Sequence, residues 1–257
     1  MTKNIENIYK DLNNLDGFVL SIYLNTNPDR MDWKIRLKNG LKRTKEYIEA
    51  SNPQQVNLFT KISKKVEQTV KDKQTSLTNS FICFASSEHL YLYHLQVPVE
   101  NDFQWEEKQS VSQLKKLFKQ YPKSGVILLQ HDKITLITSL LGEFIEKIHF
   151  KFDLETNHWK QYKRFAFGST YSNGISPRDK HSKRLRENQN RWYKTIAPTL
   201  EKYINHHGWE KIHLAGPVEL TKSMKRYLKV QITGETTRNY SGKSVHVILN
   251  KTILTTS

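Results

Sequence analysis

The stretch of sequence that determines the fold class is GVILLQHDKITLITSLLGEFIEKIHFKF, residues 125–152. It contains three runs rich in apolar and β-branched residues, Gly125–Gln130, Ile134–Leu141 and Phe144–Phe152, which predict three strands. The turns between them, Asp132-Lys133 and Gly142-Glu143, are short. Consecutive strands are therefore expected to pair antiparallel as a meander.

The segment after the meander predicts a second set of elements. Residues 153–178 are polar, rich in Gly, Ser, Asn and aromatic residues, and lack periodicity, so they are expected to form a long loop. A long helix is predicted from near Arg178 to the cap residue Gly208. The elements predicted beyond it are a strand at Lys211–Ala215, a helix at Glu219–Leu228, and strands at Lys229–Thr233 and Ser244–Leu249. Three antiparallel strands, a long helix and a strand-helix-strand unit is the order of elements in a ribonuclease H-like mixed-sheet domain.

The first part of the chain predicts a separate α/β domain. A buried strand is expected at Phe18–Leu24, and strands at Phe81–Ala85 and Leu90–Leu95 are expected to form a hairpin. Between them, apolar residues at spacings of three and four predict two helices. The polar stretch Glu100–Gln109 is the expected boundary. The predicted fold class is α/β with two domains, residues 1–105 and 106–257.

The charge of the chain indicates a polyanionic partner. Its 257 residues carry 41 Lys and Arg against 25 Asp and Glu, a net charge of +16. Nucleic acid is the first expected partner and anionic membrane the second, whereas a merely solvated basic surface is the plain alternative. The single cysteine, Cys83, lies in an apolar run and cannot form an internal disulfide. No secretory signal and no membrane-spanning run is evident, so a soluble cytoplasmic protein without membrane association is expected.

Basic residues are concentrated before and within the long helix. Between Lys160 and Lys194 there are ten basic residues and two acidic ones, which gives +8. Aromatic residues such as Trp159 and Phe165 lie among them, a composition suited to phosphates and unstacked bases of RNA. The alternative is a solvated helix face with aromatics folded back into the core. The residues expected to bind RNA are Arg178, Lys180, Lys183, Arg184, Arg186, Arg191 and Lys194.

Metal and cofactor chemistry are not expected. A ribonuclease H-type nuclease needs several carboxylates around divalent metal, usually beginning on the first strand of the meander. That strand, Gly125–Gln130, contains no acid, and Asp132, Glu143 and Asp153 fall in or beside turns. His206-His207 lacks the spacing of a helical metal pair. No metal site and no cofactor is predicted.

Three groups of residues resemble a known family. They are Gly125-Val126-Ile127-Leu128-Leu129, Arg184-Leu185-Arg186-Glu187 with Arg191-Trp192-Tyr193, and Ile212-His213-Leu214-Ala215-Gly216-Pro217. Together they resemble the central domain of the class-one release factors of archaea and eukaryotes, and the Pelota-type rescue proteins share part of this. The first half, with its strand Ser21-Ile22-Tyr23-Leu24, resembles the N-terminal domain of the bacterial branch of that superfamily.

The resemblance implies entry into the ribosomal A site, with the central domain pointing at the peptidyl-transferase centre. Active members carry Gly-Gly-Gln in a loop before the long helix, where the glutamine helps to place the hydrolytic water. Here the corresponding loop reads Ser172-Asn173-Gly174-Ile175-Ser176-Pro177-Arg178, with one glycine and no glutamine. The candidate catalytic loop is therefore Gly174, Ile175 and Ser176, with no catalytic residue assigned. The third domain of the full-length factors is not expected in a chain ending at Ser257.

Two classes of function remain open. The first is a ribosome-associated factor that binds tRNA or rRNA in the A site or on a 50S subunit, in termination, rescue or quality control. The second is an enzyme that hydrolyses peptidyl-tRNA or cleaves tRNA with a non-standard loop. The sequence does not indicate whether a partner protein is needed.

Overall fold

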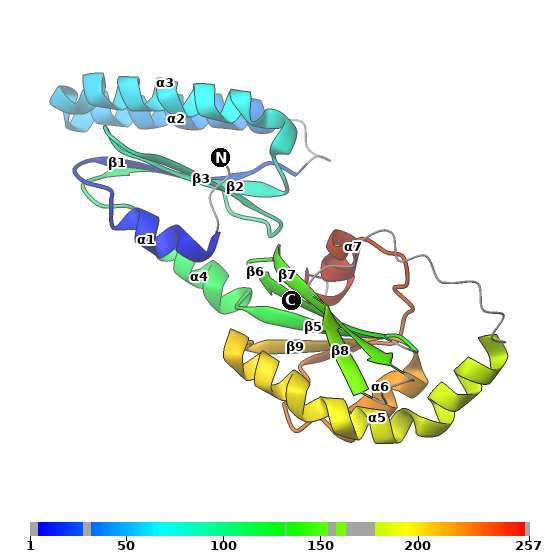
Figure 1. Ribbon diagram of the computed structural model, residues 1–257. Helices are drawn as coiled ribbons and strands as arrows, with labels where there is room; N and C mark the ends of the chain where they lie inside the picture. Colours follow the sequence, from blue (N-terminus) through cyan, green and yellow to red (C-terminus); the bar gives the residue numbers. More distant parts are fainter. Residues whose placement is uncertain (1–4, 28–31, 132, 154–157, 163–177, 255–257) are drawn as a thin grey trace. The chain divides into compact units, whose positions relative to one another are not determined.

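The computed structural model describes residues 5–27, 32–131, 133–153, 158–162 and 178–254, with side chains left aside for residues 152–189. The chain divides into two compact units, Met1–Leu117 and Phe118–Ser257 (Figure 1). The predicted α/β class with two sheets is confirmed. The boundary predicted near residue 105 stays a prediction.

The first unit is built on a four-stranded antiparallel sheet of order β3-β2-β1-β4. Its strands are β1 (Val19–Asn25), β2 (Ser80–Ala85), β3 (Leu90–Leu95) and β4 (Asp102–Glu106). The register places Ile22 of β1 opposite Cys83 on one side and Phe103 on the other. The predicted hairpin of β2 and β3 is confirmed.

Two helices cover one face of this sheet, α2 (Trp33–Ser51) and α3 (Val56–Asp72), as Figure 1 shows. Alternate residues of β1 point towards them, because side chains of a strand alternate between its faces. The core on this face contains Leu20, Ile22, Leu24, Leu37, Leu41, Ile48, Phe59, Ile62, Val66, Val70 and Cys83. The thiol of Cys83 is completely buried, and desolvation raises its pKa to about 12.

Buried polar contacts attach other segments to the sheet. The 3-10 turn Ile5–Asn7 leads into α1 (Ile8–Leu12). The hydroxyl of Tyr93 donates to Asp11 Oδ2 at 2.6 Å, and that of Tyr23 donates to the carbonyl of Ser110 at 2.8 Å. Each phenol thus places its polar end on a defined partner, as buried tyrosines require.

Strand β4 lies within the polar stretch Glu100–Gln109, which was expected to contain the boundary between the domains. The aromatic residues of β4, Phe103 and Trp105, pack against the core and alternate with polar ones. Gly40 of α2 makes room for Phe103, because a Cβ at Gly40 would come within 2.4 Å of that ring. The stretch therefore contains the fourth strand of the first sheet.

The second unit contains a six-stranded mixed sheet of order β10-β9-β5-β6-β7-β8. Its strands are β5 (Ser124–Leu129), β6 (Lys133–Leu140), β7 (Glu143–Asp153), β8 (His158–Tyr162), β9 (Lys211–Ala215) and β10 (Gly234–Thr236). The predicted antiparallel meander is confirmed for β5, β6 and β7, and β9 pairs parallel with β5. Leu141 and Gly142 both have positive φ, 50° and 75°, the conformation that a tight hairpin turn needs.

Helices cover both faces of this sheet (Figure 1). The helices α5 (Arg178–His207) and α6 (Val218–Lys225) pack against one face through Ile127, Leu129 and Leu214. Helix α7 (Val245–Leu249) and the π-helical turn Asn250–Leu254 pack against the other face through Val126 and Leu128. Helix α4 (Ser112–Gln120) precedes β5 in the chain, and its Leu114 and Leu117 are buried.

Three predictions about the second unit are wrong. The segment Lys229–Thr233 was expected to be a strand but contains none, and β10 begins only at Gly234. Strand β8 lies inside the segment expected to be a loop and pairs antiparallel with β7. The segment Ser244–Leu249 was expected to be a strand but forms α7, because the Ser244 side chain caps the helix by accepting the N–H of Val247. The ribonuclease H-like order thus carries a fourth antiparallel strand. Within the described residues, no helix is both long and apolar enough to cross a membrane.

Candidate nucleic-acid interface

The orientation of α5 is set by its apolar side. Tyr193, Ile196, Ala197, Leu200 and Ile204 belong to the core between this helix and the sheet. Because these residues recur at spacings of three and four, they occupy one stripe of the helix. The opposite side faces solvent and carries Arg191, Lys194 and Lys202, all exposed.

The residues expected to bind RNA are located as follows. Arg178, Lys180, Lys183, Arg184 and Arg186 lie in the first turns of α5, and their side chains are outside the described part. Arg191 and Lys194 lie one turn apart and are exposed. The loop residues Gly174, Ile175 and Ser176 are outside the described residues.

The helix α6 adds further cations beside α5. The hydroxyl of Ser223 donates to Asn190 Oδ1 at 2.6 Å, and the backbone N–H of Lys229 donates to the Glu201 carboxylate. Both acceptors lie on the stripe of α5 that contains Lys194, since positions 190, 194 and 201 are spaced by whole turns. Lys222 of α6 and Arg226, the C-cap residue of that helix, are both exposed. The sequence pattern gave no sign of this pairing, because the two helices are joined by a non-local hydrogen bond.

An ion pair orders the edge of this surface. The ammonium of Lys225 lies 2.7 Å from Glu235 Oε2. The hydrogen bond from Lys225 is the main cause of a lowered pKa at Glu235, with a second bond from Thr221. Lys225 is thus partly neutralised, whereas Arg191 and Lys194 have no ion-pair partner among the described residues.

A polar network attaches the end of α5 to the sheet. The imidazole Nδ1 of His207 lies 3.0 Å from Glu146 Oε1, and its ring lies 4.0 Å from that of Tyr203. The Tyr203 hydroxyl lies 3.4 Å from Thr138 Oγ1, which also accepts from the indole of Trp209 at 3.2 Å. His207 therefore fastens the helix to β7. Of the two histidines at the helix end, only His206 is exposed.

A second basic surface lies on the other face of the meander, and sequence reasoning missed it. The register pairs Lys133 with Lys151 and Thr135 with His149, and Lys147 lies two residues from His149 on the same face. The Thr135 hydroxyl and His149 Nδ1 are 2.8 Å apart. Desolvation, then the charges of Lys133 and Lys147, lower the pKa of His149 to about 4, so its imidazole is neutral near pH 7. Lys147, His149 and Lys151 at alternate positions of β7 were a signal that could have revealed this surface.

Among the described residues, carboxylates do not gather around a metal position. Within the part that the structure describes, no three His, Cys, Asp or Glu side chains are arranged to hold an ion. Glu143 is half-buried at the start of β7, and desolvation raises its pKa to about 7. Function without metal stays a prediction.

The elements described so far define an α/β protein with a mixed sheet, a long helix with exposed cations, and the strand-to-helix turn Ala215-Gly216-Pro217. Residues 122–254 match the family model described as "Bacterial archaeo-eukaryotic release factor family 5". The match spans more than half of the chain, and the chain belongs to this family. Its role is accordingly release-factor-like and related to translation.

Other proteins are similar along nearly the whole chain. The uncharacterized protein YocB of Bacillus subtilis (strain 168) is 28% identical over 241 residues, 91% of either chain. A solved structure described as an archaeal protein has a TM-score of 0.33 and 11% identity, covering 98% of this chain and 74% of its own. The archaeal translation termination factor aRF1 has a TM-score of 0.32 and 13% identity, covering 96% and 71%. The family assignment depends on the family model and not on these structures.

Proposed function

We propose that the protein is a cytoplasmic, ribosome-associated factor that binds tRNA or rRNA in translation termination, ribosome rescue or quality control. Its membership of a release-factor family supports a place in translation. The observation that carries the RNA-binding part is the outer side of α5, where Arg191 and Lys194 are exposed and unpaired among the described residues. Two such cations one turn apart suit successive phosphates of a nucleic-acid backbone.

The proposed interface consists of Arg178, Lys180, Lys183, Arg184, Arg186, Arg191 and Lys194 of α5. The hydrogen bonds from α6 and the His207–Glu146 pair hold the helix against the sheet, so its charges are presented by a supported element. Lys222 of α6 and its C-cap residue Arg226 add two exposed cations to this basic surface. The partner that we propose is a ribosomal particle, at the A site or on a 50S subunit carrying tRNA.

Co-sedimentation with ribosomal subunits tests this proposal. Wild-type protein should pellet with the particles, and the Arg191→Glu/Lys194→Glu variant should stay in the supernatant. Lys243→Glu/Lys251→Glu is a matched control, because these exposed lysines flank α7 on the other face of the same sheet. Equal pelleting of the two double variants would reject α5 as the interface.

The catalytic alternative depends on Gly174, Ile175 and Ser176, which lie outside the described residues. Hydrolysis of peptidyl-tRNA or cleavage of tRNA therefore stays a prediction from the sequence.

A further inference from the structure

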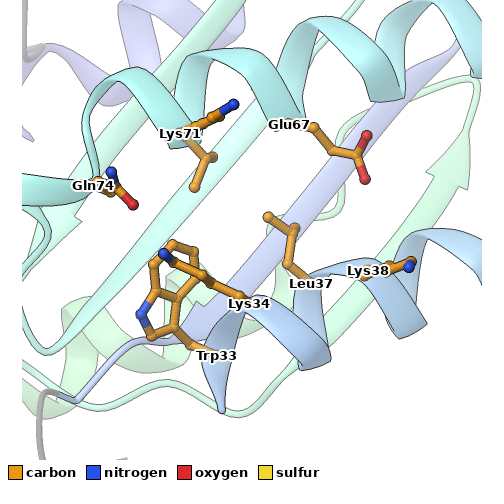
Figure 2. A pocket seen from close by; sticks show the side chains of 8 residues that line it. Trp33, Lys34, Leu37, Lys38, Glu67, Lys71 and Gln74 are labelled. Carbon is orange, nitrogen blue, oxygen red and sulfur yellow. The ribbon is translucent and has the colours of Figure 1, made fainter. Parts of the chain in front are cut away.

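A groove in the first unit lies between the first turns of α2 and the last turns of α3 (Figure 2). Its volume is about 360 Å³, within the range of roughly 300–1,000 Å³ typical of small-ligand sites. A smaller hollow of about 270 Å³ continues past Trp33 towards Gln74 and Thr75. Trp33, Lys34 and Gln74 line both hollows.

The floor of the groove is apolar. Leu37 and Val70 belong to the buried core, and Trp33 packs against that core while remaining half-exposed. In Figure 2 the indole stands at one end of the groove and Leu37 points into it. The ammonium of Lys34 lies 5.5 Å from the centroid of the Trp33 ring. A face of the indole is therefore accessible to a group outside the core.

The rim of the groove is cationic. Lys34, Lys38 and Lys71 line it together with one acid, Glu67. The helices α2 and α3 carry ten basic residues against four acidic ones, a net charge of +6. Other lysines of α2 are already paired along the helix, as Lys42 is with Glu46 and Lys45 with Glu49. The charge at the groove therefore favours an anionic ligand.

These features together select a class of ligand. A planar ring stacks on an accessible indole, an apolar floor contacts its edge, and ammonium groups on the rim donate hydrogen bonds to phosphate oxygens. The amide of Gln74 lies beside Trp33 and can donate to or accept from a base edge (Figure 2). An unpaired nucleotide within a single RNA strand has all of these parts.

We propose that this groove binds an unpaired nucleotide of single-stranded RNA, with the base stacked on Trp33 and the flanking phosphates held by Lys34, Lys38 and Lys71. On binding, Lys34 exchanges its contact with the indole for a phosphate oxygen, and the base takes its place on the ring. This site belongs to the first unit and does not depend on α5. It gives the protein a contact for an unpaired strand that is separate from the interface proposed above.

The test measures binding of the full chain to a fluorescent hexamer of adenylate and to a hexamer of the same backbone without bases. Trp33→Leu should lower the affinity for the adenylate hexamer roughly tenfold, the loss expected when one stacked base is released. Trp33→Phe should retain most of the affinity. The Lys34→Gln/Lys38→Gln/Lys71→Gln variant should reduce the slope of log affinity against log salt by about two units. Lys42→Gln/Lys45→Gln removes paired charges from the same helix and should change affinity less than twofold.

Several results would overturn the proposal. The first is equal binding of the hexamer without bases, with the same sensitivity to Trp33→Leu, because the groove would then bind phosphate alone. A second is equally tight competition by an acidic peptide of matched charge. If Trp33→Leu lowers the thermal midpoint, Trp33→Phe and photocrosslinking of a 5-bromouridine hexamer to the wild type decide the question. Crosslinks away from Trp33 would reject the site. Arg191→Glu/Lys194→Glu should leave the Trp33 crosslink intact, so failure here is distinguishable from failure of the proposed function.

Discussion

The indole of Trp209 lies directly over Gly125 of strand β5. A Cβ at Gly125 would come within 1.9 Å of indole Cε3, a distance that no packed structure tolerates. The indole is held in place because its Nε1 donates to Thr138 Oγ1 on the neighbouring strand. Trp209 directly follows the left-handed residue Gly208 that ends α5. Position 125 thus has to be glycine, because the segment that follows α5 places the Trp209 ring against it.

Gly125→Ala should therefore destabilise the second unit. Forcing a methyl group against a fixed ring costs about 1–3 kcal/mol, and this site is at the upper end because backbone and ring are both constrained. Gly242→Ala is a suitable comparison, since a Cβ there meets nothing within 4 Å and only the φ of 72° is unfavourable. Its cost should be about 1 kcal/mol. Urea unfolding followed by circular dichroism measures both, and equal losses would contradict the packing argument.

The charge of α5 predicts a specific salt dependence. Changing Lys183, Arg184 and Arg191 together to Glu should nearly abolish tRNA binding. Each phosphate contact contributes roughly 0.7–0.9 to the slope of log affinity against log salt, so the residual slope should fall by about two units or more. Filter binding at salt concentrations between about 50 and 200 mM measures this slope, because affinity that depends on phosphate contacts falls steeply over that range. An unchanged slope would mean that the phosphates are bound elsewhere.

Glu143 predicts a loss of stability towards neutral pH. Desolvation raises its pKa from 4.5 to about 7 in the folded protein. As pH rises from 4.5 to 7, the unfolded chain releases this proton while the folded chain retains it, so stability falls over that window. Glu143→Gln should be more stable than wild type at pH 8 by on the order of 1–2 kcal/mol, after allowance for solvent screening. The two proteins should converge near pH 4, and a constant difference across the range would contradict this.

His149 predicts the opposite dependence. Its pKa is lowered from 6.5 to about 4 in the folded protein. As pH falls from 6.5 to 4, the unfolded chain gains a proton that the folded chain excludes, so stability is lost on acidification. His149→Asn can keep the contact with Thr135 without titrating, and should reduce the acid loss by on the order of 1 kcal/mol. Thermal midpoints of variant and wild type at pH 7.5 and 4.5 measure this, and parallel curves would show that another group is responsible.

Peptide release by the Gly-Gly-Gln route is not expected, because the loop Ser172–Arg178 contains one glycine and no glutamine. Wild-type protein should release no peptide from peptidyl-tRNA on 50S subunits, in an assay where a factor with Gly-Gly-Gln does. Gly174→Val should leave ribosome association unchanged. Release by the wild type, abolished by Gly174→Val, would instead support the enzymatic alternative, since close backbone approach would then matter.

The elements that sequence reasoning located correctly have strong periodic patterns. The meander β5–β7 and helix α5 contain long runs of apolar residues at spacings of two and of three to four. Strand β8 was missed because HWKQY is mostly polar and forms an edge strand of the sheet. Strand β4 was missed because its alternation of aromatic and polar residues spans only five positions. In α7, β-branched residues suggested a strand, but the cap from Ser244 favours a helix.

For the candidate interface, the cations could be counted from the sequence but their support could not. The hydrogen bond between Ser223 and Asn190 joins residues that are 33 positions apart. The ion pair between His207 and Glu146 likewise joins a helix end to a strand far away in sequence. Likewise, Trp33 and Lys71 line one groove only because α2 and α3 pack side by side. Local patterns carry no information about such pairs.

The burial of Cys83 makes thiol labelling a probe of the opening of the first unit. It is the single cysteine of the sequence and lies on β2 of the first unit. A thiol that is completely buried, with a pKa near 12, reacts with a maleimide only when its sheet opens. Labelling kinetics of the wild type therefore report opening of the first unit alone, as the second unit has no thiol. A cysteine introduced at exposed Thr195 would take a fluorophore selectively, without prior removal of any native thiol.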